Sequence, residues 1–491
     1  MRRTLTSLTI LLPLALGLPL QPQSAHAQEA GAVVERQRAV EAGLLPAVLI
    51  TGEPEPSYSI YERMEHYGVP GVSIAVINDG QIEWAEGYGV KRIGGADSVV
   101  PGTLFQAASI SKPVAATAAL QLVEEGLLDL DAAINSHLTS WQIPANDFTD
   151  ELPVTLRGIL THSAGLTIHG FPGYGPGEAV PTTVGVLDGA GNTDPVVVDT
   201  FPGSLFRYSG GGYTIAEVAM EDVTGDDFAA VMDRLVLDPF GMRASTYEQP
   251  LPERLADVAA VAHRGDGTTV DGRWHTYPEQ AAAGLWTTPS DLARYALGIR
   301  TAYLGEPGAI LDQATAREML EEHMGGWGIG LSVAGEGDGF RFSHGGANAG
   351  YRAYFVLYPA TGDGVAVMTN SDSGNPLYME VIRAVSRVYG WPDYQPETLT
   401  VVDLAPAILA DYVGRYELEP GNVLTISLEG EQLFASAPGL GKLLLRAQSE
   451  TDFFPEGNQF SLTFVRSAEG DVSHLILHVG GTDMEVRRVG S

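Results

Sequence analysis

Before residue 390, the spacing of hydrophobic residues changes from that of β-strands to that of helices and back to that of strands. Residues 71–90 (GVSIAVINDGQIEWAEGYGV) contain an apolar run, a turn at Asn78-Asp79-Gly80 and a second run of alternating apolar and polar residues, which predicts a β-hairpin. From residue 340 the segments FRFSHGG, YRAYFVLYP and GVAVMTNS again have the composition of strands. Strands at both ends with helices between them predict one sheet whose N-terminal and C-terminal strands pair.

Helical patterns fill the middle of this region. Residues 113–126 (PVAATAALQLVEEG) place small and apolar side chains on one stripe, which predicts a helix. A second helix is predicted to start at a capping box formed by Thr214 and Glu217, and a third at Thr288. Residues 166–205 are rich in Gly and Pro, which indicates a long loop over a cleft.

The last hundred residues are organised differently. Residues 391–406, which begin WPDYQPETLT, are predicted to be a linker, and residues 407–491 alternate short strands with turn signals. We therefore predict a mixed α/β (α+β) fold: a helix-flanked antiparallel sheet over residues 28–390, then a small C-terminal antiparallel β domain.

The first 27 residues have the three-part pattern of a secretory signal peptide. Arg2 and Arg3 form a basic start, residues 8–20 are apolar, and Ala25-His26-Ala27 is a small-x-small cleavage site. Prolines interrupt the apolar stretch, which is too short to span a bilayer. Since the chain has no cysteine to carry a lipid, we expect a periplasmic or secreted protein without a membrane span.

Composition argues against several classes of function. The formal net charge of −33 disfavours nucleic acids and anionic membranes as partners, because both are polyanions. The absence of cysteine excludes a thiol nucleophile, disulfides and Cys-ligated zinc. No His-Glu-x-x-His motif, P-loop or dinucleotide fingerprint is present, so no metal or other cofactor is expected. The oligomeric state is left open.

The candidate chemistry begins with a lysine that is unusual in this composition. Only Lys91, Lys112 and Lys442 occur, so 25 of the 28 basic residues are arginine. Lys112 follows Ser109 by three residues in FQAASISKP, just before the first predicted helix. Arginine cannot lose its proton near neutral pH, whereas a desolvated lysine can, so Ser-x-x-Lys places a hydroxyl nucleophile beside a proton acceptor. For the motif taken alone, a serine helix cap followed by a solvated lysine is the structural alternative.

Five segments together resemble the serine β-lactamase and penicillin-binding-protein superfamily, most closely its class C-like branch. In chain order they are GTLFQAASISKP (102–113), LRGILTHSAGL (156–166), FRYSGGGYT (206–214), AAGLWTTPSDLARY (282–295) and SHGGANAGYRAYF (343–355). Their order and spacing agree with that branch from about residue 60 to 375. The resemblance implies a β-lactamase-like fold, in which a helical subdomain accompanies the antiparallel sheet.

The resemblance also implies roles for individual residues. Ser109 would be the acyl-accepting nucleophile and Lys112 its proton partner. Tyr208 would share general acid and base duty with Lys112, which would be the cation that lowers the Tyr208 pKa. His344 would line the cleft and assist Tyr208. The backbone N–H groups of Ser109 and Ala347 would form the oxyanion hole.

Two departures from the family pattern affect the expected substrate. Gly210 replaces the asparagine of Tyr-x-Asn, and His344-Gly345-Gly346 replaces Lys-Thr-Gly. In the family those groups recognise the carboxylate of β-lactams and D-alanyl peptides, so efficient β-lactam hydrolysis is not expected here. Gly210, Gly345 and Gly346 are predicted to line the substrate site, and Arg352 is the first alternative residue for binding a carboxylate.

The predicted function is that of a secreted serine hydrolase, which cleaves an ester or amide bond of a small molecule or peptide through an acyl-Ser109 intermediate. Three subclasses stay open: an esterase, a D-alanyl carboxypeptidase or D-aminopeptidase, and a class C-type β-lactamase. Two alternatives belong to other classes: a non-catalytic binding or sensor protein on the same fold, and a functional C-terminal β domain beside a vestigial hydrolase.

Two other patterns are weaker candidates. THSAG at 161–165 approaches the Gly-x-Ser-x-Gly elbow, but Thr161 replaces the first glycine, so Ser163 is not expected to be a nucleophile. His474 and His478 share one face of a predicted strand without a third ligand, so metal binding there is not expected.

Overall fold

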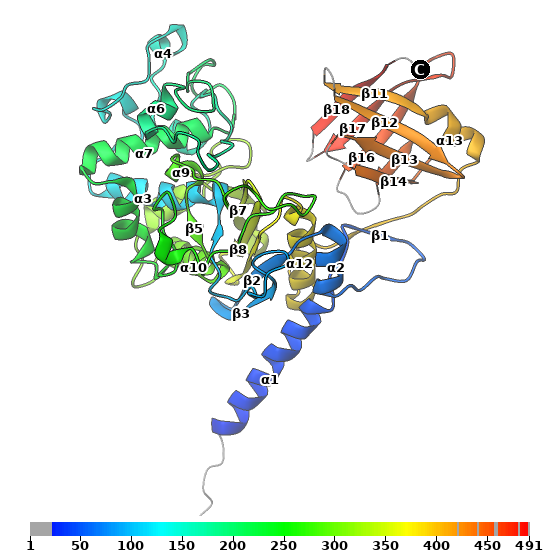
Figure 1. The fold of residues 1–491 in the computed structure, drawn as a ribbon, viewed down its shortest axis with the longest axis horizontal. Coiled ribbons are helices and arrows are strands. Elements are labelled where there is room, and N and C mark those ends of the chain that lie inside the picture. The colour runs from blue at the N-terminus through cyan, green and yellow to red at the C-terminus, as the bar shows by residue number, and fades with distance from the viewer. Residues whose placement is uncertain (1–21, 420–421, 439–440, 456–459, 480–481, 490–491) are drawn as a thin grey trace, which may run out of the picture.

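The computed structural model describes residues 22–419, 422–438, 441–455, 460–479 and 482–489 (Figure 1). Its main sheet has six strands in the order β3-β2-β9-β8-β7-β6 and is antiparallel. These strands are β2 (Gly71–Asn78), β3 (Gln81–Gly89), β6 (Ser332–Ala334), β7 (Arg341–Asn348), β8 (Tyr351–Tyr358) and β9 (Asp363–Thr369). β2 and β3 form the predicted hairpin, and β2 pairs with β9, with Ser73 opposite Met368. The predicted fold class and the pairing of the N-terminal and C-terminal strands are confirmed.

Two short sheets, the α-helices and several short helical turns complete the chain before the first strand of the C-terminal domain. β1 (Val48–Ile50) pairs in parallel with β10 (Glu397–Leu399), and β4 (Phe105–Gln106) pairs with β5 (Trp286–Thr287). The α-helices are α1 (Pro22–Glu41), α2 (Ile60–Tyr67), α3 (Ser111–Glu124), α4 (Asp147–Glu151), α5 (Leu156–Leu160), α6 (Thr183–Leu187), α7 (Gly210–Thr224), α8 (Phe228–Met232), α9 (Gln280–Ala283), α10 (Pro289–Leu304), α11 (Gln313–Met319), α12 (Gly374–Tyr389) and α13 (Pro406–Tyr412). Shorter turns are η1 (Ala108–Ile110), η2 (Ile134–Ser136), η3 (Asp233–Leu237), η4 (Glu253–Leu255) and η5 (Gly337–Gly339).

Helices cover both faces of the main sheet, because alternate residues of its strands point into two different cores. On β9, Ala366 and Met368 pack into the core that contains α3, α7 and α10, whereas Val365 and Val367 pack against α1, α2 and α12. Figure 1 shows α12 and α2 on one side of the sheet and the larger group of helices on the other. The candidate chemistry lies on the side of the larger group.

Helix α7 begins earlier than its sequence predicts. Ser209 is its N-cap and accepts a hydrogen bond from Gly212 N at 3.0 Å, so Thr214 and Glu217 lie inside the helix and form no capping box. Three consecutive glycines disfavour a helix start in a sequence, but here loop 166–205 packs on this turn and provides carbonyl partners. The other predicted helix starts agree with α3 and α10.

The segment before the main sheet and the predicted linker both contain regular structure. Residues 28–60 include most of α1, and β1 pairs with β10 within the predicted linker 391–406. Of the predicted signal peptide, residues 1–21 lie outside the described residues and 22–27 begin α1, so export stays a prediction. Within the described ranges, no helix combines the length and apolar character needed to cross a bilayer.

The C-terminal domain is a closed barrel of eight antiparallel strands, separate from the main sheet (Figure 1). Its strands are β11 (Gly414–Glu419), β12 (Asn422–Glu429), β13 (Gln432–Ala437), β14 (Gly441–Ala447), β15 (Asp452–Pro455), β16 (Phe460–Arg466), β17 (Val472–Val479) and β18 (Thr482–Val489). Pairing of β11 with β18 closes the barrel around a core that includes Tyr416, Leu433, Phe464 and Leu475. The predicted antiparallel β domain is confirmed, and its closure leaves no free strand edge.

Candidate active site

Ser109 lies in the short turn η1, between strand β4 and helix α3. Ala107, Ala108 and Ile110 around it are buried, whereas Ser109 itself is partly exposed. Ala108 has φ +52°, a left-handed conformation that costs free energy for a residue with a side chain. Surrounding packing therefore holds this turn in a strained geometry that leaves one hydroxyl accessible.

Lys112 is buried in the first turn of α3, beside Ser109. Its Nζ lies 3.1 Å from Ser109 Oγ and donates a hydrogen bond to Ala282 O at 2.9 Å. Burial lowers the Lys112 pKa from 10.5 to about 7, because the charged form is poorly solvated. No carboxylate pairs with Lys112 in the described structure, so a large fraction of this amine is neutral at pH 7 and can accept the Ser109 proton.

Two residues that the sequence analysis missed hold the carbonyl partner of Lys112. Buried Glu217 on α7 accepts a hydrogen bond from Ala281 N at 2.8 Å, which fixes the short helix α9 that carries Ala282 O. Asn348 on β7 donates to Ala283 O at 3.1 Å and to Gln106 Oε1 at 2.9 Å. The sequence predicted only a helix-capping role for Glu217. Its contact with α9 could not be predicted, because only the tertiary structure brings α7 against α9.

Tyr208 lies directly before the N-cap of α7, with its ring over Lys112. Lys112 Nζ is 4.9 Å from the ring centroid. Burial raises the Tyr208 pKa well above 10, and a hydrogen bond with the Ser109 side chain lowers it by less. The expected lowering by Lys112 is not found: burial and the hydrogen bond with Ser109 are the causes of the shift, and Lys112 itself has a pKa of about 7. Tyr208 is therefore a protonated phenol that can donate a proton.

His344 is buried on β7 and faces the same side of the sheet as the catalytic candidates. Its Nδ1–H donates to Gly345 O at 2.6 Å, which leaves a lone pair on Nε2, and Nε2 is buried without a hydrogen-bond partner in the described structure. Burial, together with nearby Lys112, lowers the His344 pKa to about 3. The ring centroids of His344 and Tyr208 are 6.4 Å apart. His344 is therefore a neutral hydrogen-bond acceptor.

The glycines after His344 let β7 approach the nucleophile turn. A Cβ on Gly346 would lie 2.1 Å from Ala107 O, so only glycine fits at this crossing. β6 pairs with β7 only at residues 341–343, and Ala347 beyond that pairing is exposed. This arrangement brings the Ala347 segment near Ser109. The use of the two backbone N–H groups as an oxyanion hole stays a prediction.

Gly210 has no open space where the family has an asparagine side chain. A Cβ there would lie 2.9 Å from Phe171 Cε2 and 3.1 Å from His169 O, because loop 166–205 packs on the first turn of α7. The His169 ring also lies 4.8 Å from the Tyr208 ring. Loop 166–205 thus occupies the space that the asparagine side chain fills in the family, so no vacant subsite is left there.

Arg352 lies on the opposite face of the sheet from His344. It pairs with Ala347 in the β7–β8 register, whereas His344 pairs with Phe355, and paired residues share a face. Its guanidinium donates to Asn348 O and Tyr351 O at 2.7 Å and forms an ion pair with Asp372 at 3.0 Å. These contacts direct Arg352 away from the Ser109 side of the sheet, so the structure does not support it as a carboxylate-binding residue of this site.

An aromatic cluster around Tyr208 was also missed by the sequence analysis. The Trp327 ring lies edge-to-face with Tyr208 at 5.6 Å and with His344 at 5.2 Å. The buried His162 ring stacks on Tyr208 at 4.1 Å. The only sequence signal for His162 is its position in the family-like segment 156–166, and Trp327 lies in none of the five segments.

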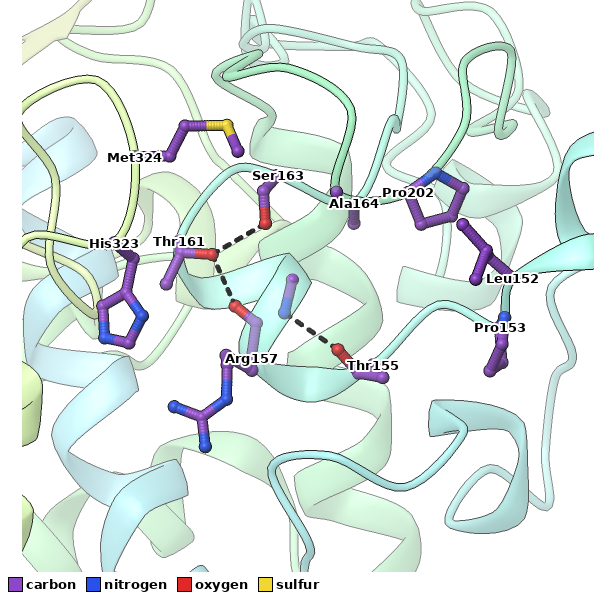
Figure 2. A pocket seen from close by; sticks show the side chains of 12 residues that line it. Leu152, Pro153, Thr155, Arg157, Thr161, Ser163, Ala164, Pro202, His323 and Met324 are labelled. Carbon is purple, nitrogen blue, oxygen red and sulfur yellow. Dashed lines mark hydrogen bonds between the residues drawn. The ribbon is translucent and has the colours of Figure 1, made fainter.

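The Ser163 hydroxyl lies in a different place, in a pocket of about 290 Å³ shown in Figure 2. It hydrogen-bonds to Thr161 Oγ1 at 3.0 Å, with His323 and Met324 across the pocket. No lysine, and none of the catalytic candidates, lines this pocket. In the barrel, His478 contacts Asp483 and Thr463, whereas His474 contacts Ser473, so the two histidines share no partner.

Comparison with known proteins agrees with this geometry. Residues 59–389 match the family model described as Beta-lactamase, and residues 400–488 match a domain of unknown function, DUF3471. Penicillin-binding protein 4 of Amycolatopsis lactamdurans is 27% identical over 73% of this chain and 96% of its own length. Esterase EstB of Burkholderia gladioli is 31% identical over 45% of this chain and 58% of its own length.

Solved structures show the same fold. The octameric penicillin-binding protein homologue from Pyrococcus abyssi has a TM-score of 0.61 and 24% identity, over 87% of this chain and 98% of that one. The D-amino acid amidase of Ochrobactrum anthropi has a TM-score of 0.56 and 21% identity, over 72% and 99%. With its helix-flanked sheet and the family match over residues 59–389, the chain belongs to the Beta-lactamase family and is a serine hydrolase of the β-lactamase and penicillin-binding-protein type.

Proposed function

We propose that this protein is an exported hydrolase that cleaves an ester or amide bond of a small molecule or peptide through an acyl-Ser109 intermediate. The observation that carries the proposal is a partly exposed serine hydroxyl 3.1 Å from a buried lysine amine whose pKa is lowered to about 7. The named relatives, a penicillin-binding protein, an esterase and a D-amino acid amidase, support an ester or amide substrate.

The proposed steps follow from the positions of these groups. Lys112 accepts the Ser109 proton as Oγ attacks the carbonyl carbon, and the developing oxyanion is bound by the Ser109 and Ala347 N–H groups. Tyr208 donates its phenol proton to the leaving group, and the proton held by Lys112 replaces it. Water then attacks the acyl-enzyme as Lys112 takes a proton from it, and Lys112 passes this proton to Ser109 Oγ as the acyl group leaves, which restores the neutral amine and the serine hydroxyl.

Selectivity is proposed to favour substrates without a carboxylate near the scissile bond. His344 is neutral, Arg352 faces the other side of the sheet, and loop 166–205 fills the position of the missing asparagine side chain. Each absent hydrogen bond to a charged group costs about 1.5–3 kcal/mol, or roughly ten- to a hundredfold in kcat/KM when it is made in the transition state. A D-alanyl carboxypeptidase or class C-type β-lactamase is therefore the weaker candidate.

We expect p-nitrophenyl butyrate and a D-alanyl amide to be hydrolysed with at least a roughly tenfold higher kcat/KM than nitrocefin. All three substrates are to be compared on one preparation, and intact mass after a serine-directed phosphonate counts the active molecules. Nitrocefin turning over fastest would contradict the proposed selectivity. A folded protein that neither reacts with the phosphonate nor hydrolyses any substrate would support the non-catalytic binding alternative.

The pH dependence should report the ionisation of Lys112. Because the neutral amine is the active form and its pKa is about 7, kcat/KM for an ester should rise with pH to a midpoint near 7. At pH 5 only about 1% of Lys112 would be neutral, so activity should fall roughly a hundredfold below the plateau. Ionisation of His344 cannot account for this rise, since the His344 pKa is about 3. A flat profile between pH 5 and 8, with circular dichroism showing a folded protein throughout, would rule out Lys112 as the base.

A further inference from the structure

Tyr208 lies in the irregular backbone before α7, outside any helix or strand, and contacts Ser109 through its side chain. Its ring must lie over Lys112 while its hydroxyl reaches Ser109. The neighbouring residues Arg207 and Ser209 lead from loop 166–205 into α7. Some other part of the fold must therefore fix this residue.

One buried residue, His162, contacts Tyr208 and both of its neighbours in the chain. The His162 carbonyl accepts a hydrogen bond from Arg207 N at 2.8 Å, and His162 Nδ1 accepts one from Ser209 N at 3.1 Å. The two backbone amides on either side of Tyr208 are thus bound to the same residue. Between them the two rings stack, with centroids 4.1 Å apart and planes 29° apart.

The backbone of His162 is itself constrained. Its φ is +59°, in the left-handed region that a histidine side chain adopts only at a cost. Its N–H donates to Ile159 O at 3.2 Å at the end of α5, and its side chain is 1% exposed. A left-handed residue at this point turns the carbonyl and the ring toward the same neighbouring loop.

The ring is held in one protonation state. Since Nδ1 accepts from a backbone amide, the ring proton is on Nε2, which is buried without a hydrogen-bond partner among the described residues. Burial is the main cause that holds the His162 pKa well below 6.5, and nearby Lys112 contributes to the same shift. Protonation would also break the bond to Ser209. His162 contacts neither Ser109 nor Lys112 by any hydrogen bond in the described structure, so any effect on the reaction passes through Tyr208.

We propose that His162 is the positioning residue of this site: it binds the amides on both sides of Tyr208 and stacks on its ring, so that the phenol stays over Lys112 and in contact with Ser109. The inference rests on the proposed role of Tyr208 in proton transfer. It adds a residue to the site that takes no part in bond making and acts only through the placement of Tyr208.

The test is a double-mutant cycle on ester hydrolysis with the full chain. His162→Ala should lower kcat about a hundredfold, the usual scale for a displaced catalytic group, while KM changes by less than about threefold. In His162→Ala the midpoint of the rise of kcat/KM with pH should move to higher pH. The reason is that a mobile Tyr208 ring lets water reach Lys112, which moves the Lys112 pKa back toward its ordinary value. Tyr208→Phe should cost roughly a thousandfold, and adding His162→Ala to it should cost less than about threefold more.

A conservative variant keeps the test valid if His162→Ala folds poorly. In His162→Asn the side-chain Oδ1 lies near the position of His162 Nδ1, and asparagine tolerates a positive φ. The kcat of His162→Asn should therefore be at least about tenfold higher than that of His162→Ala, and asparagine can replace alanine in the cycle. Ser163→Ala is the matched control in the same loop: its hydroxyl contacts Thr161, and its activity should equal that of the wild type. Phosphonate titration and thermal melts correct every rate for the fraction of folded protein.

Two outcomes would overturn the inference and leave the acyl-Ser109 proposal intact. One is a double variant whose fold loss of kcat equals the product of the two single losses, and the other is wild-type kcat in folded His162→Ala. Wild-type kcat in Tyr208→Phe would remove the proposed role of Tyr208 and this inference with it. The two failures are therefore distinguishable in one set of measurements.

Discussion

Replacement of Ser109 by alanine should abolish ester hydrolysis, with kcat reduced by roughly 10³-fold or more, because the covalent nucleophile is lost. The site itself should survive, since Ser109 is partly exposed and its removal leaves Lys112 bonded to Ala282 O. The phosphonate adduct should also disappear from the intact mass. Both losses are expected together, because one oxygen atom accounts for both reactions.

A second serine provides the comparison for Ser109→Ala. Ser163 is in the segment that resembles a nucleophile elbow, yet its hydroxyl lies in the separate pocket of Figure 2. Ser163→Ala should keep wild-type kcat and full phosphonate labelling. If folded Ser109→Ala protein still hydrolysed the ester and still gained the phosphonate mass, Ser109 would not be the nucleophile.

Lys112→Arg should be nearly as inactive as Lys112→Ala, with a loss of about 10²- to 10⁴-fold, the usual range for removing a general base. The physical reason is that arginine stays protonated in proteins, whereas the buried amine of Lys112 has a pKa of about 7. A guanidinium is also larger than an ammonium group, and Lys112 Nζ already contacts Ser109 Oγ at 3.1 Å and Ala282 O at 2.9 Å.

Lys91→Arg is the matched control for this substitution. Lys91 is partly exposed, donates to Asp257 O at 2.7 Å and lies outside the site, so the same change there should leave kcat unaltered. Rates are to be normalised to the folded fraction from thermal melts. Near-normal activity in Lys112→Arg would mean that a fixed positive charge suffices and that another group accepts the Ser109 proton.

The assignment of protons within the site could not be predicted from the sequence. The family resemblance implied a tyrosine whose pKa is lowered by a charged lysine, and the reference pKa of a histidine is about 6.5. Burial reverses this arrangement, since it lowers the pKa of Lys112 and His344 and raises that of Tyr208. Desolvation depends on every element packed around a group, and these elements are far apart in the chain.

Local pattern and spacing alone determined the hairpin 71–90, the helix that follows Ser109, the helix start at Thr288 and the antiparallel nature of the C-terminal domain, because short-range periodicity and turn chemistry fix these features. The pairing of Ser109 with Lys112 was also local, since three residues of a helical turn bring them together. Only the tertiary structure decided the early start of α7 under loop 166–205 and the closure of the barrel by β11 and β18. It also decided the face of the sheet on which Arg352 lies and the contacts of His162 with Tyr208 and its neighbours. Each of these depends on contacts between segments distant in sequence, whose packing outweighs local preference.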